Sequence, residues 1–428
     1  MTTTAALVPV ETRTLANGLR VVLSEDHTVP IVAVNLWYHV GSANERPGRT
    51  GFAHLFEHML FQGSAHVGAN EHFELIQRAG GTLNGSTWLD RTNYFETLPA
   101  NQLALGLWLE ADRMGALLPA MTQEKLDTQR DVVKNERRWT VDNQPYGTWW
   151  ERLPALCFPP EHPFHHSLIG SMEDLSAASL DDVTEFFRTY YTPDNCVLTV
   201  TGDFDPAEAE TLIRQYFEAI PRGSGRPPLP DMSVPPVFGE WRREIVPDDV
   251  AVPRVFLAFR SPVFGSDEYF VATLVVGVLG VERGSRLHRI LVRDRQLASA
   301  ATAFTFDLAK GTDLLVIDAT ARPGVDGTAL EDGIVSVVDE LRASGVSAEE
   351  LERVMALEET GFVLALQSAA ERADRLSRYA TYLGDPRLIN EHLARLQRVT
   401  VDDVNAFIRD RLGPDNRATL MYVPRGSS

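Results

Sequence analysis

The segment LDDVTEFFRTYYTPDNCVLTV, from Leu180 to Val200, recurs as VDDVNAFIRDRLGPDNRATLM, from Val401 to Met421, and the two align without gaps. Each copy has an acidic pair suited to the first turn of a helix, then a Pro-Asp-Asn turn, then a mainly apolar run. Each copy therefore predicts a helix, a tight turn and a strand. Because one copy closes each half of the chain, we infer an internal duplication.

The duplication divides the 428-residue chain into two halves of ordinary domain size. Dense proline and glycine in PRGSGRPPLPDMSVPP, Pro221 to Pro236, favour an extended connector over a helix or a central strand. We therefore predict domains at residues 1–220 and 241–428, joined by a linker at 221–240. Strands mixed with helices in each half predict an α+β fold, in which a mainly antiparallel sheet is covered by helices, occurring twice.

Several local patterns support this architecture. TLANGLRVVLSED predicts a hairpin whose turn is Asn17-Gly18. IVAVNLWYHVG, Ile31 to Gly41, predicts a buried strand that is followed, after a loop, by a helix. Residues Gly80 to Pro99 predict one or two strands, and Thr122 to Asp142 predict a long helix.

Composition excludes several classes of partner. A formal net charge of -19 argues against nucleic acid, which needs clustered Lys and Arg, and would suit cationic ligands. The longest apolar run, Tyr269 to Val281, is shorter than the roughly 20 residues of a membrane span. The N-terminus has no secretory pattern, and Cys157 and Cys196 are too few for a disulfide framework. We therefore expect a cytoplasmic protein with buried free thiols that binds neither membrane nor nucleic acid.

The stretch HLFEH, His54 to His58, carries the chemistry. It belongs to a predicted amphipathic helix with Thr50 as its N-cap. Because His54 and His58 are four residues apart, both imidazoles project from one side of the helix and could bind one metal ion. Glu57 lies on nearly the same face, within reach of a water molecule on that metal. Such histidine pairs also occur in ordinary helices, but H-x-x-E-H is the pattern of inverted zincins and favours the metal site.

A catalytic zinc ion normally has three protein ligands and an open position for water. The candidate third ligand is Glu136 in DVVKNERRW. From the residues alone, a surface glutamate paired with a nearby arginine is the simpler interpretation of Glu136.

The sequence resembles the pitrilysin, insulin-degrading enzyme and mitochondrial processing peptidase family over nearly its whole length. The resemblance rests on HLFEHMLFQGS and VVKNERRWTVDNQPYG, supported in the family's order and spacing by GGTLNGSTWLDRTNYF, HPFHHSLIGSMEDL and YYTPDNCVLTVTGD. It implies a pair of similar α+β domains and one Zn²⁺ per chain. The implied zinc ligands are His54, His58 and Glu136, and the implied general base is Glu57.

The resemblance also implies a substrate site. Four residues match the strand on which family members bind the substrate peptide as an added β-strand: Asn84, Gly85, Ser86 and Thr87. Backbone hydrogen bonds of that kind hold an extended peptide with little sequence preference. The simpler alternative for Asn84-Gly85 is a turn.

The sequence departs from the family pattern in two places. Gln129 stands seven positions before Glu136, where many relatives have an acidic residue, which weakens any role in orienting a ligand. Val292 and Ser299 stand where self-sufficient relatives have the arginine and tyrosine that grip the substrate. The resemblance therefore implies the catalytic subunit of a heterodimer, whose homologous partner supplies that pair. A homodimer is the less favoured alternative.

The leading hypothesis is a zinc metalloendopeptidase that hydrolyses short or unfolded peptides, basic ones among them, inside a closed chamber. The alternative is a non-catalytic peptide-binding or scaffold subunit, because the family includes chains that have lost the zinc site. The complete set of His54, Glu57, His58 and Glu136 argues against that alternative. A metal enzyme acting on other substrates has no support in the sequence.

Overall fold

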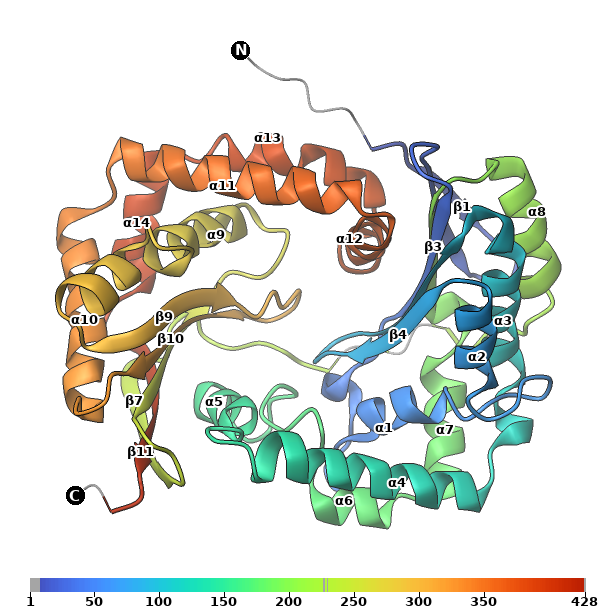
Figure 1. Cartoon of the computed structure of the whole chain (residues 1–428), viewed down its shortest axis with the longest axis horizontal. Coiled ribbons are helices and arrows are strands. Elements are labelled where there is room, and N and C mark those ends of the chain that lie inside the picture. Colours follow the sequence, from blue (N-terminus) through green and yellow to red (C-terminus); the bar gives the residue numbers. More distant parts are fainter. Residues whose placement is uncertain (1–7, 226–227, 229, 427–428) are drawn as a thin grey trace. The chain divides into compact units, whose positions relative to one another are not determined.

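The computed structural model describes residues 8–225, 228 and 230–426, which form two compact units (Figure 1). Unit 1 comprises Met1–Asn135, Ser167–Pro230 and Val363–His392, and unit 2 comprises Glu136–His166, Asp231–Phe362 and Leu393–Ser428. Each unit therefore contains one segment from the other half of the sequence. The predicted segments, 1–220, 221–240 and 241–428, describe how the duplicated halves follow one another along the sequence. They stay a prediction.

Unit 1 is built on a six-stranded sheet in the order β1-β2-β6-β3-β5-β4. The strands are β1 (Glu11–Thr14), β2 (Arg20–Glu25), β3 (Ile31–Tyr38), β4 (Thr82–Thr87), β5 (Thr92–Pro99) and β6 (Cys196–Gly202). All neighbouring strands are antiparallel except β2 and β6. The predicted hairpin, with its turn at Asn17-Gly18, is confirmed as β1–β2. β4 lies at the edge of the sheet beside β5.

Unit 2 repeats this plan with a five-stranded sheet in the order β7-β11-β8-β10-β9. The strands are β7 (Glu240–Asp248), β8 (Arg254–Ser261), β9 (Ala298–Thr305), β10 (Asp313–Ala321) and β11 (Asn416–Pro424). Only β7 and β11 are parallel neighbours. The prediction of a mainly antiparallel α+β sheet that occurs twice is confirmed.

The repeated sequence forms the same structure in both units. Helices α7 (Leu180–Tyr190) and α14 (Val401–Arg411) both begin with a capping box, in which Ser179 or Thr400 is the N-cap. After the turn, the side-chain amide of Asn195 donates to the carbonyl oxygen of Tyr190, at 2.9 Å. Asn416 donates in the same way to the carbonyl oxygen of Arg411, at 2.7 Å. Each asparagine thus ties the end of its helix to the start of the following central strand.

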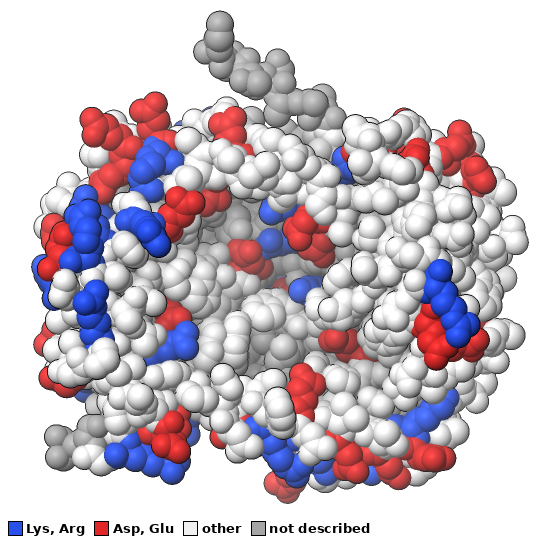
Figure 2. Space-filling model, viewed as in Figure 1, with Lys and Arg blue, Asp and Glu red and all other residues white. Residues whose placement is uncertain are grey.

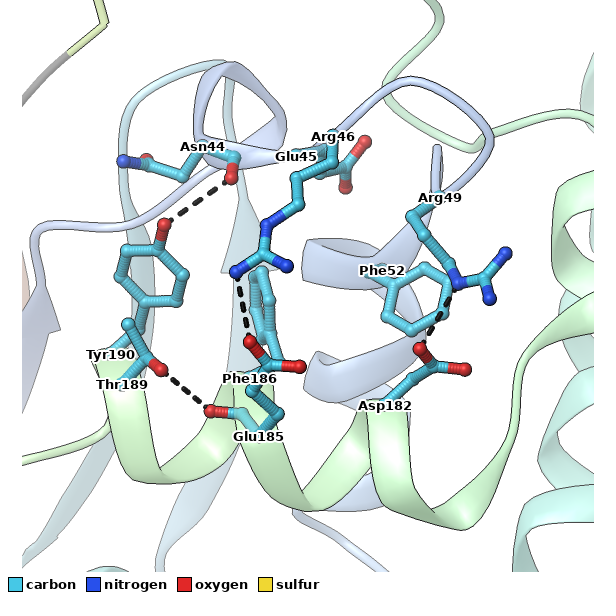
Figure 3. A pocket seen from close by; sticks show the side chains of 10 residues that line it. All are labelled: Asn44, Glu45, Arg46, Arg49, Phe52, Asp182, Glu185, Phe186, Thr189 and Tyr190. Carbon is cyan, nitrogen blue, oxygen red and sulfur yellow. Dashed lines mark hydrogen bonds and ion pairs between the residues drawn. The ribbon is translucent and has the colours of Figure 1, made fainter.

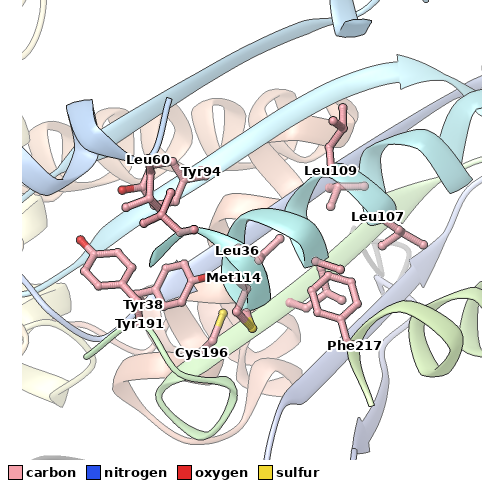
Figure 4. Close-up of a cluster of buried hydrophobic side chains, with 14 of the residues drawn as sticks. Leu36, Tyr38, Leu60, Tyr94, Leu107, Leu109, Met114, Tyr191, Cys196 and Phe217 are labelled. Atoms are coloured by element: carbon pink, nitrogen blue, oxygen red, sulfur yellow. The ribbon is translucent and has the colours of Figure 1, made fainter. Parts of the chain in front are cut away.

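The core of unit 1 follows from strand periodicity, since alternate side chains of a strand point to opposite faces of the sheet. Val34, Leu36 and Tyr38 of β3 lie in a large apolar cluster with side chains from α1 (Phe52–Met59), α3 (Leu103–Ala116) and α8 (Pro206–Phe217). Figure 4 shows Leu107, Leu109 and Met114 of α3 together with Leu36, Tyr38 and Phe217. This cluster fixes α1, and with it HLFEH, against the sheet.

Helix α12 (Ala369–Tyr382), from the second half of the sequence, covers the opposite face of the unit 1 sheet. Its contacts are largely polar: Trp37 Nε1 donates to Asp374 at 2.9 Å, and Ser377 Oγ donates to Thr199 Oγ1 at 2.7 Å. In unit 2, α5 (Trp149–Cys157), from the first half, packs on β11, β7 and β8. The two units have therefore exchanged equivalent helices.

The remaining helices complete the covering layers. They are α2 (Glu71–Arg78), α4 (Gln123–Arg137), α6 (Met172–Ala177), α9 (Asp267–Gly280), α10 (Gly327–Ser344), α11 (Ala348–Gln367) and α13 (His392–Leu396). Among the described residues, no helix is both long enough and apolar enough to span a bilayer. Cys157 and Cys196 are buried free thiols, as predicted. Figure 2 shows acidic and basic side chains intermixed over the visible face.

Candidate metal centre

The helix that carries HLFEH begins differently from the prediction. Thr50 is not its N-cap; Gly51 is, in a left-handed conformation with φ of 84°. A Cβ at Gly51 would lie 2.5 Å from the carbonyl oxygen of Ile169, so glycine suits both the conformation and the space. The Glu45 carboxylate accepts hydrogen bonds from the backbone N–H of Gly51 and Ala53, at 2.9 and 2.8 Å. An acidic group there also complements the helix dipole.

The two histidines lie on the side of α1 that the core leaves uncovered. The buried residues of the helix are Phe52, Ala53, Leu55, Phe56 and Met59. His54, Glu57 and His58 are only partly buried. The imidazole centroids of His54 and His58 are 4.8 Å apart with an interplanar angle of 75°. The predicted convergence of the two rings is therefore present in the structure.

Glu136 completes a three-residue cluster. It is the penultimate residue of α4, before a π-helical turn at Arg138–Asp142. One ligand atom each from His54, His58 and Glu136 lies within 4.8 Å of the others. Tetrahedral zinc with bonds of about 2.1 Å holds its ligand atoms about 3.4 Å apart, so small side-chain adjustments suffice. Two imidazoles and a carboxylate are also a known catalytic zinc set, and the residues fit the ion that the sequence predicts.

The four predicted substrate-binding residues form most of β4, so the alternative of a simple turn at Asn84-Gly85 is wrong. They point to two faces. Gly85 and Thr87 are buried, whereas Asn84 is exposed and Ser86 is partly exposed. The hydroxyl of Thr87 donates to Glu57 Oε2 at 2.6 Å. The structure therefore places one predicted substrate residue in direct contact with the predicted general base.

The departures from the family pattern also have defined places. Gln129 is a buried residue of α4. Val292 lies in a π-helical turn at His288–Asp294, and its carbonyl oxygen accepts a hydrogen bond from Arg322 Nη2 at 3.2 Å. Ser299 lies on β9, and its hydroxyl is within 3.2 Å of the carbonyl oxygen of Thr320. The Val292 side chain has no donor, and the Ser299 hydroxyl is engaged within its own sheet.

A second cluster of potential ligands escaped the sequence analysis. His72, Glu96 and Glu110 converge in the core of unit 1, and all three are buried. Burial is the main cause that raises the pKa of Glu96 well above its usual range, and the neighbouring Glu110 is the next largest cause. Burial lowers the pKa of His72 to about 2, which keeps its imidazole neutral. The guanidinium of Arg113 bonds to Glu110 and balances its charge. With Glu96 protonated, the cluster of His72, Glu96 and Glu110 together with Arg113 therefore has no net charge and needs no metal ion.

The sequence did contain a signal for this cluster. Tyr94, Glu96 and Leu98 alternate along β5, and because a strand has a period of two, all three must share one face. Tyr94 and Leu98 are core residues, which places Glu96 in the core as well. The partners on α2 and α3 depend on tertiary packing and have no such local signal.

A surface pocket lies beside the start of α1 (Figure 3). Four of its five charged lining residues form ion pairs: Arg46 with Glu185 at 2.8 Å, and Arg49 with Asp182 at 3.1 Å. None of the residues that line it belongs to the H-x-x-E-H cluster. We therefore place the candidate functional site at His54, Glu57, His58 and Glu136.

Known proteins resemble this chain in sequence and in structure. Two family models match it: Insulinase (Peptidase family M16) over residues 20–154, and Peptidase M16 inactive domain over residues 177–357. Zinc protease PqqE of Helicobacter pylori is 30% identical over 415 residues, which cover 96% of this chain and 92% of that protein. Mitochondrial-processing peptidase subunit beta of Blastocladiella emersonii is 27% identical, over 93% of this chain and 86% of that protein.

Solved structures give the same picture. The crystal structure of a protease from Helicobacter pylori matches with a TM-score of 0.92 at 28% identity, and the match covers 98% of this chain and 100% of that chain. A peptidase M16 inactive domain from Pseudomonas fluorescens has a TM-score of 0.87 at 18% identity, which is a likeness of fold. That match covers 97% of this chain and 98% of that chain.

Proposed function

Starting from the fact that the chain belongs to peptidase family M16, we propose that it is a zinc-dependent endopeptidase that hydrolyses short or unfolded peptides. The observation that carries the proposal is the convergence of His54, His58 and Glu136, with Glu57 on the same helix as the two histidines. Relatives named zinc proteases support it. The predicted stoichiometry of one Zn²⁺ per chain is part of the proposal.

The chemistry divides between the ion and the protein. A zinc ion bound at this cluster would activate a water molecule and polarise the carbonyl of the scissile peptide bond. Glu57 accepts the proton of the attacking water and returns it to the leaving amine nitrogen. His54, His58 and Glu136 would hold the ion from two helices, and the apolar face of α1 fixes the position of the histidines. The reaction therefore needs no further cofactor.

The substrate would bind along β4. This strand pairs with β5 on one edge, and no strand among the described residues pairs with the other. An extended peptide can add there through backbone hydrogen bonds, which explains how diverse sequences would be accepted. Because Thr87 of β4 contacts Glu57, a peptide on this edge would lie beside the catalytic helix. The net charge of -19 favours basic peptides among the substrates.

The structure of unit 2 bears on the partner. Val292 and Ser299 stand where self-sufficient family members are expected to have the substrate-gripping arginine and tyrosine. Neither residue can replace a long donor, because the Val292 side chain has no donor and the Ser299 hydroxyl already donates within its own sheet. We therefore propose a heterodimer in which a homologous partner supplies the missing pair, with a homodimer as the weaker alternative. The relative named as a peptidase beta subunit is an example of a subunit in this family.

The non-catalytic alternative is a peptide-binding or scaffold subunit. The family description of residues 177–357 as an inactive domain concerns a segment that contains no H-x-x-E-H, so it does not favour this alternative for the segment that carries the motif. A scaffold would not need stoichiometric zinc. The predicted cytoplasmic location has no bearing on the choice and stays a prediction.

Removal of the metal tests the proposed chemistry. We expect the purified chain to bind one equivalent of zinc, and a chelator to abolish cleavage of a quenched fluorescent, arginine-containing peptide. Zinc added back should restore cleavage, because the three ligand atoms converge within the folded chain. Metal analysis and peptide fluorescence follow the two steps. Cleavage that survives complete zinc removal would refute the proposal.

Addition of a homologous partner tests the divided site. The zinc-loaded chain alone is expected to cleave the peptide at least tenfold more slowly than the chain mixed with a homologue that carries the arginine and tyrosine. The physical reason is that an ungripped peptide spends less time in a reactive position. Comparable, chelator-sensitive rates with and without the homologue would exclude the heterodimer and leave the peptidase proposal intact.

A further inference from the structure

Strand β4 and helix α1 meet at Glu57. The two elements pack against each other within unit 1. Gly85 and Thr87 lie on the same face of β4, because residues two apart on a strand face the same way. Both are buried, whereas Asn84, on the opposite face, is exposed. The buried face of β4 is therefore the face that meets Glu57.

Two contacts define how β4 holds this carboxylate. The Thr87 hydroxyl donates to Glu57 Oε2 at 2.6 Å. On the other side, a Cβ placed on Gly85 would lie 3.1 Å from Glu57 Cγ and 3.2 Å from Oε1. These distances are tighter than ordinary van der Waals contact, so Glu57 would have to shift by a few tenths of an ångström to make room for a side chain at Gly85. One contact orients the carboxylate and the other leaves room for it.

We propose that Thr87 is a positioning residue for Glu57: its hydroxyl fixes the orientation in which the carboxylate takes the proton from water. This inference rests on the proposed peptidase function. A flexible glutamate has several rotamers. A hydrogen bond that disfavours the unreactive rotamers raises the fraction of time that the carboxylate spends in the reactive geometry. It also gives β4 two separate roles, since its backbone edge would bind the substrate while its buried face positions the base.

The test compares Thr87→Val, which keeps the shape and loses the donor, with Thr87→Ser, which keeps the donor. We expect Thr87→Val to lower kcat about 10- to 100-fold, the range for loss of a supporting hydrogen bond at a metal site, with KM changed by less than about twofold. Thr87→Ser should recover most of kcat. Thr97→Val, at a partly exposed position on neighbouring β5, is the matched control and should behave as the parent.

A measurement of Tm, which does not depend on activity, separates a role of Thr87 in orienting Glu57 from a general effect on the stability of the protein. In metal-free protein, Thr87→Val should lower the Tm in the parent chain but not in a Glu57→Ala background, because the hydrogen bond is already absent there. Zinc content of the Thr87 variants should equal that of the parent. Equal Tm losses in both backgrounds would overturn the inference, as would a rise in KM at unchanged kcat, which would make Thr87 a substrate contact.

Failure of the inference differs from failure of the proposed function. If Thr87→Val keeps its kcat while Glu57→Gln is inactive, Thr87 does not position the base and the peptidase proposal stands. If Glu57→Gln itself cleaves like the parent, the proposed function fails and the inference fails with it. A Thr87→Ser variant as slow as Thr87→Val would also overturn the inference, because the hydroxyl would then not be the group that matters.

Discussion

Replacing Glu57 with Gln is expected to reduce peptide cleavage about 10²- to 10⁴-fold, the contribution of a well-placed general base. Glutamine keeps the size of the side chain and can still accept the hydrogen bond of Thr87, so the fold around α1 should not change. It cannot take a proton from water at neutral pH. Because Glu57 is not one of the three predicted ligands, the variant should bind one equivalent of zinc.

The measurement is kcat/KM on the fluorescent peptide together with metal content. A matched control is Glu74→Gln, at an exposed helical glutamate of unit 1 that pairs with Arg78. We expect that variant to cleave at the parent rate. Wild-type-like turnover by zinc-loaded Glu57→Gln would contradict the assignment of the general base. Loss of zinc from the variant would instead make Glu57 a ligand.

Replacing Arg113 with Met is expected to have the largest effect on stability, a loss of about 3–5 kcal/mol in the free energy of unfolding. Arg113 is buried, bonds to the buried Glu110 and lies over the ring of Tyr94 with 4.2 Å from its Cζ to the ring centroid. Methionine fills part of the space but removes the only positive charge described for this cluster. The carboxylate of Glu110 would then be buried without compensation. Thermal or denaturant unfolding measures the loss.

The control is Arg78→Met, at an exposed arginine, for which we expect a change within about 0.5 kcal/mol. An equal effect of both substitutions would contradict the role of Arg113.

Glu96→Gln should leave the protein as stable as the parent at acidic pH and more stable at alkaline pH. The folded protein holds the Glu96 proton more tightly than the unfolded chain, because the pKa of Glu96 is raised.

The sign of that pH dependence follows from proton linkage. The contribution of protonated Glu96 to stability is complete below the unfolded pKa of about 4.5 and is lost as pH rises towards the raised folded pKa. Over that range the parent should lose up to about 1.4 kcal/mol per pH unit, and Glu96→Gln should lack this component. Unfolding measured from pH 5 to pH 9 would show it. Identical pH profiles for parent and variant would exclude a protonated Glu96.

Features encoded by neighbouring residues were predictable from the sequence. The hairpin at Asn17-Gly18 and the helix–turn–strand repeat depend on local turn chemistry and capping, and both are present. His54 and His58 converge because helical spacing alone brings them together. The position of Glu136, on a different helix, came from the family resemblance, since no local pattern relates α4 to α1.

Features that depend on tertiary contacts were missed. Thr50 has a good capping side chain, but the N-cap is the left-handed Gly51, and the carboxylate of Glu45 accepts the hydrogen bonds at the helix start. The contact of Thr87 with Glu57 needs the packing of β4 on α1. The partner of a sheet face, such as α12 on β3, also has no sequence signal, because small residues like Ala33 and Ala373 only permit the approach.

The exchange of helices has a consequence for biosynthesis. Unit 1 contains the N-terminal strand of its sheet and also α12, which begins at Ala369, so most of the chain must be translated before that sheet face can be covered. At about 5–20 residues per second, the ribosome takes on the order of half a minute to reach that point. During this interval the incomplete sheet remains open to chaperones and to other nascent chains. The same arrangement makes the two halves of the sequence depend on each other, because a ribosome that stopped at the linker would release the first half without the helix that covers the second face of its sheet.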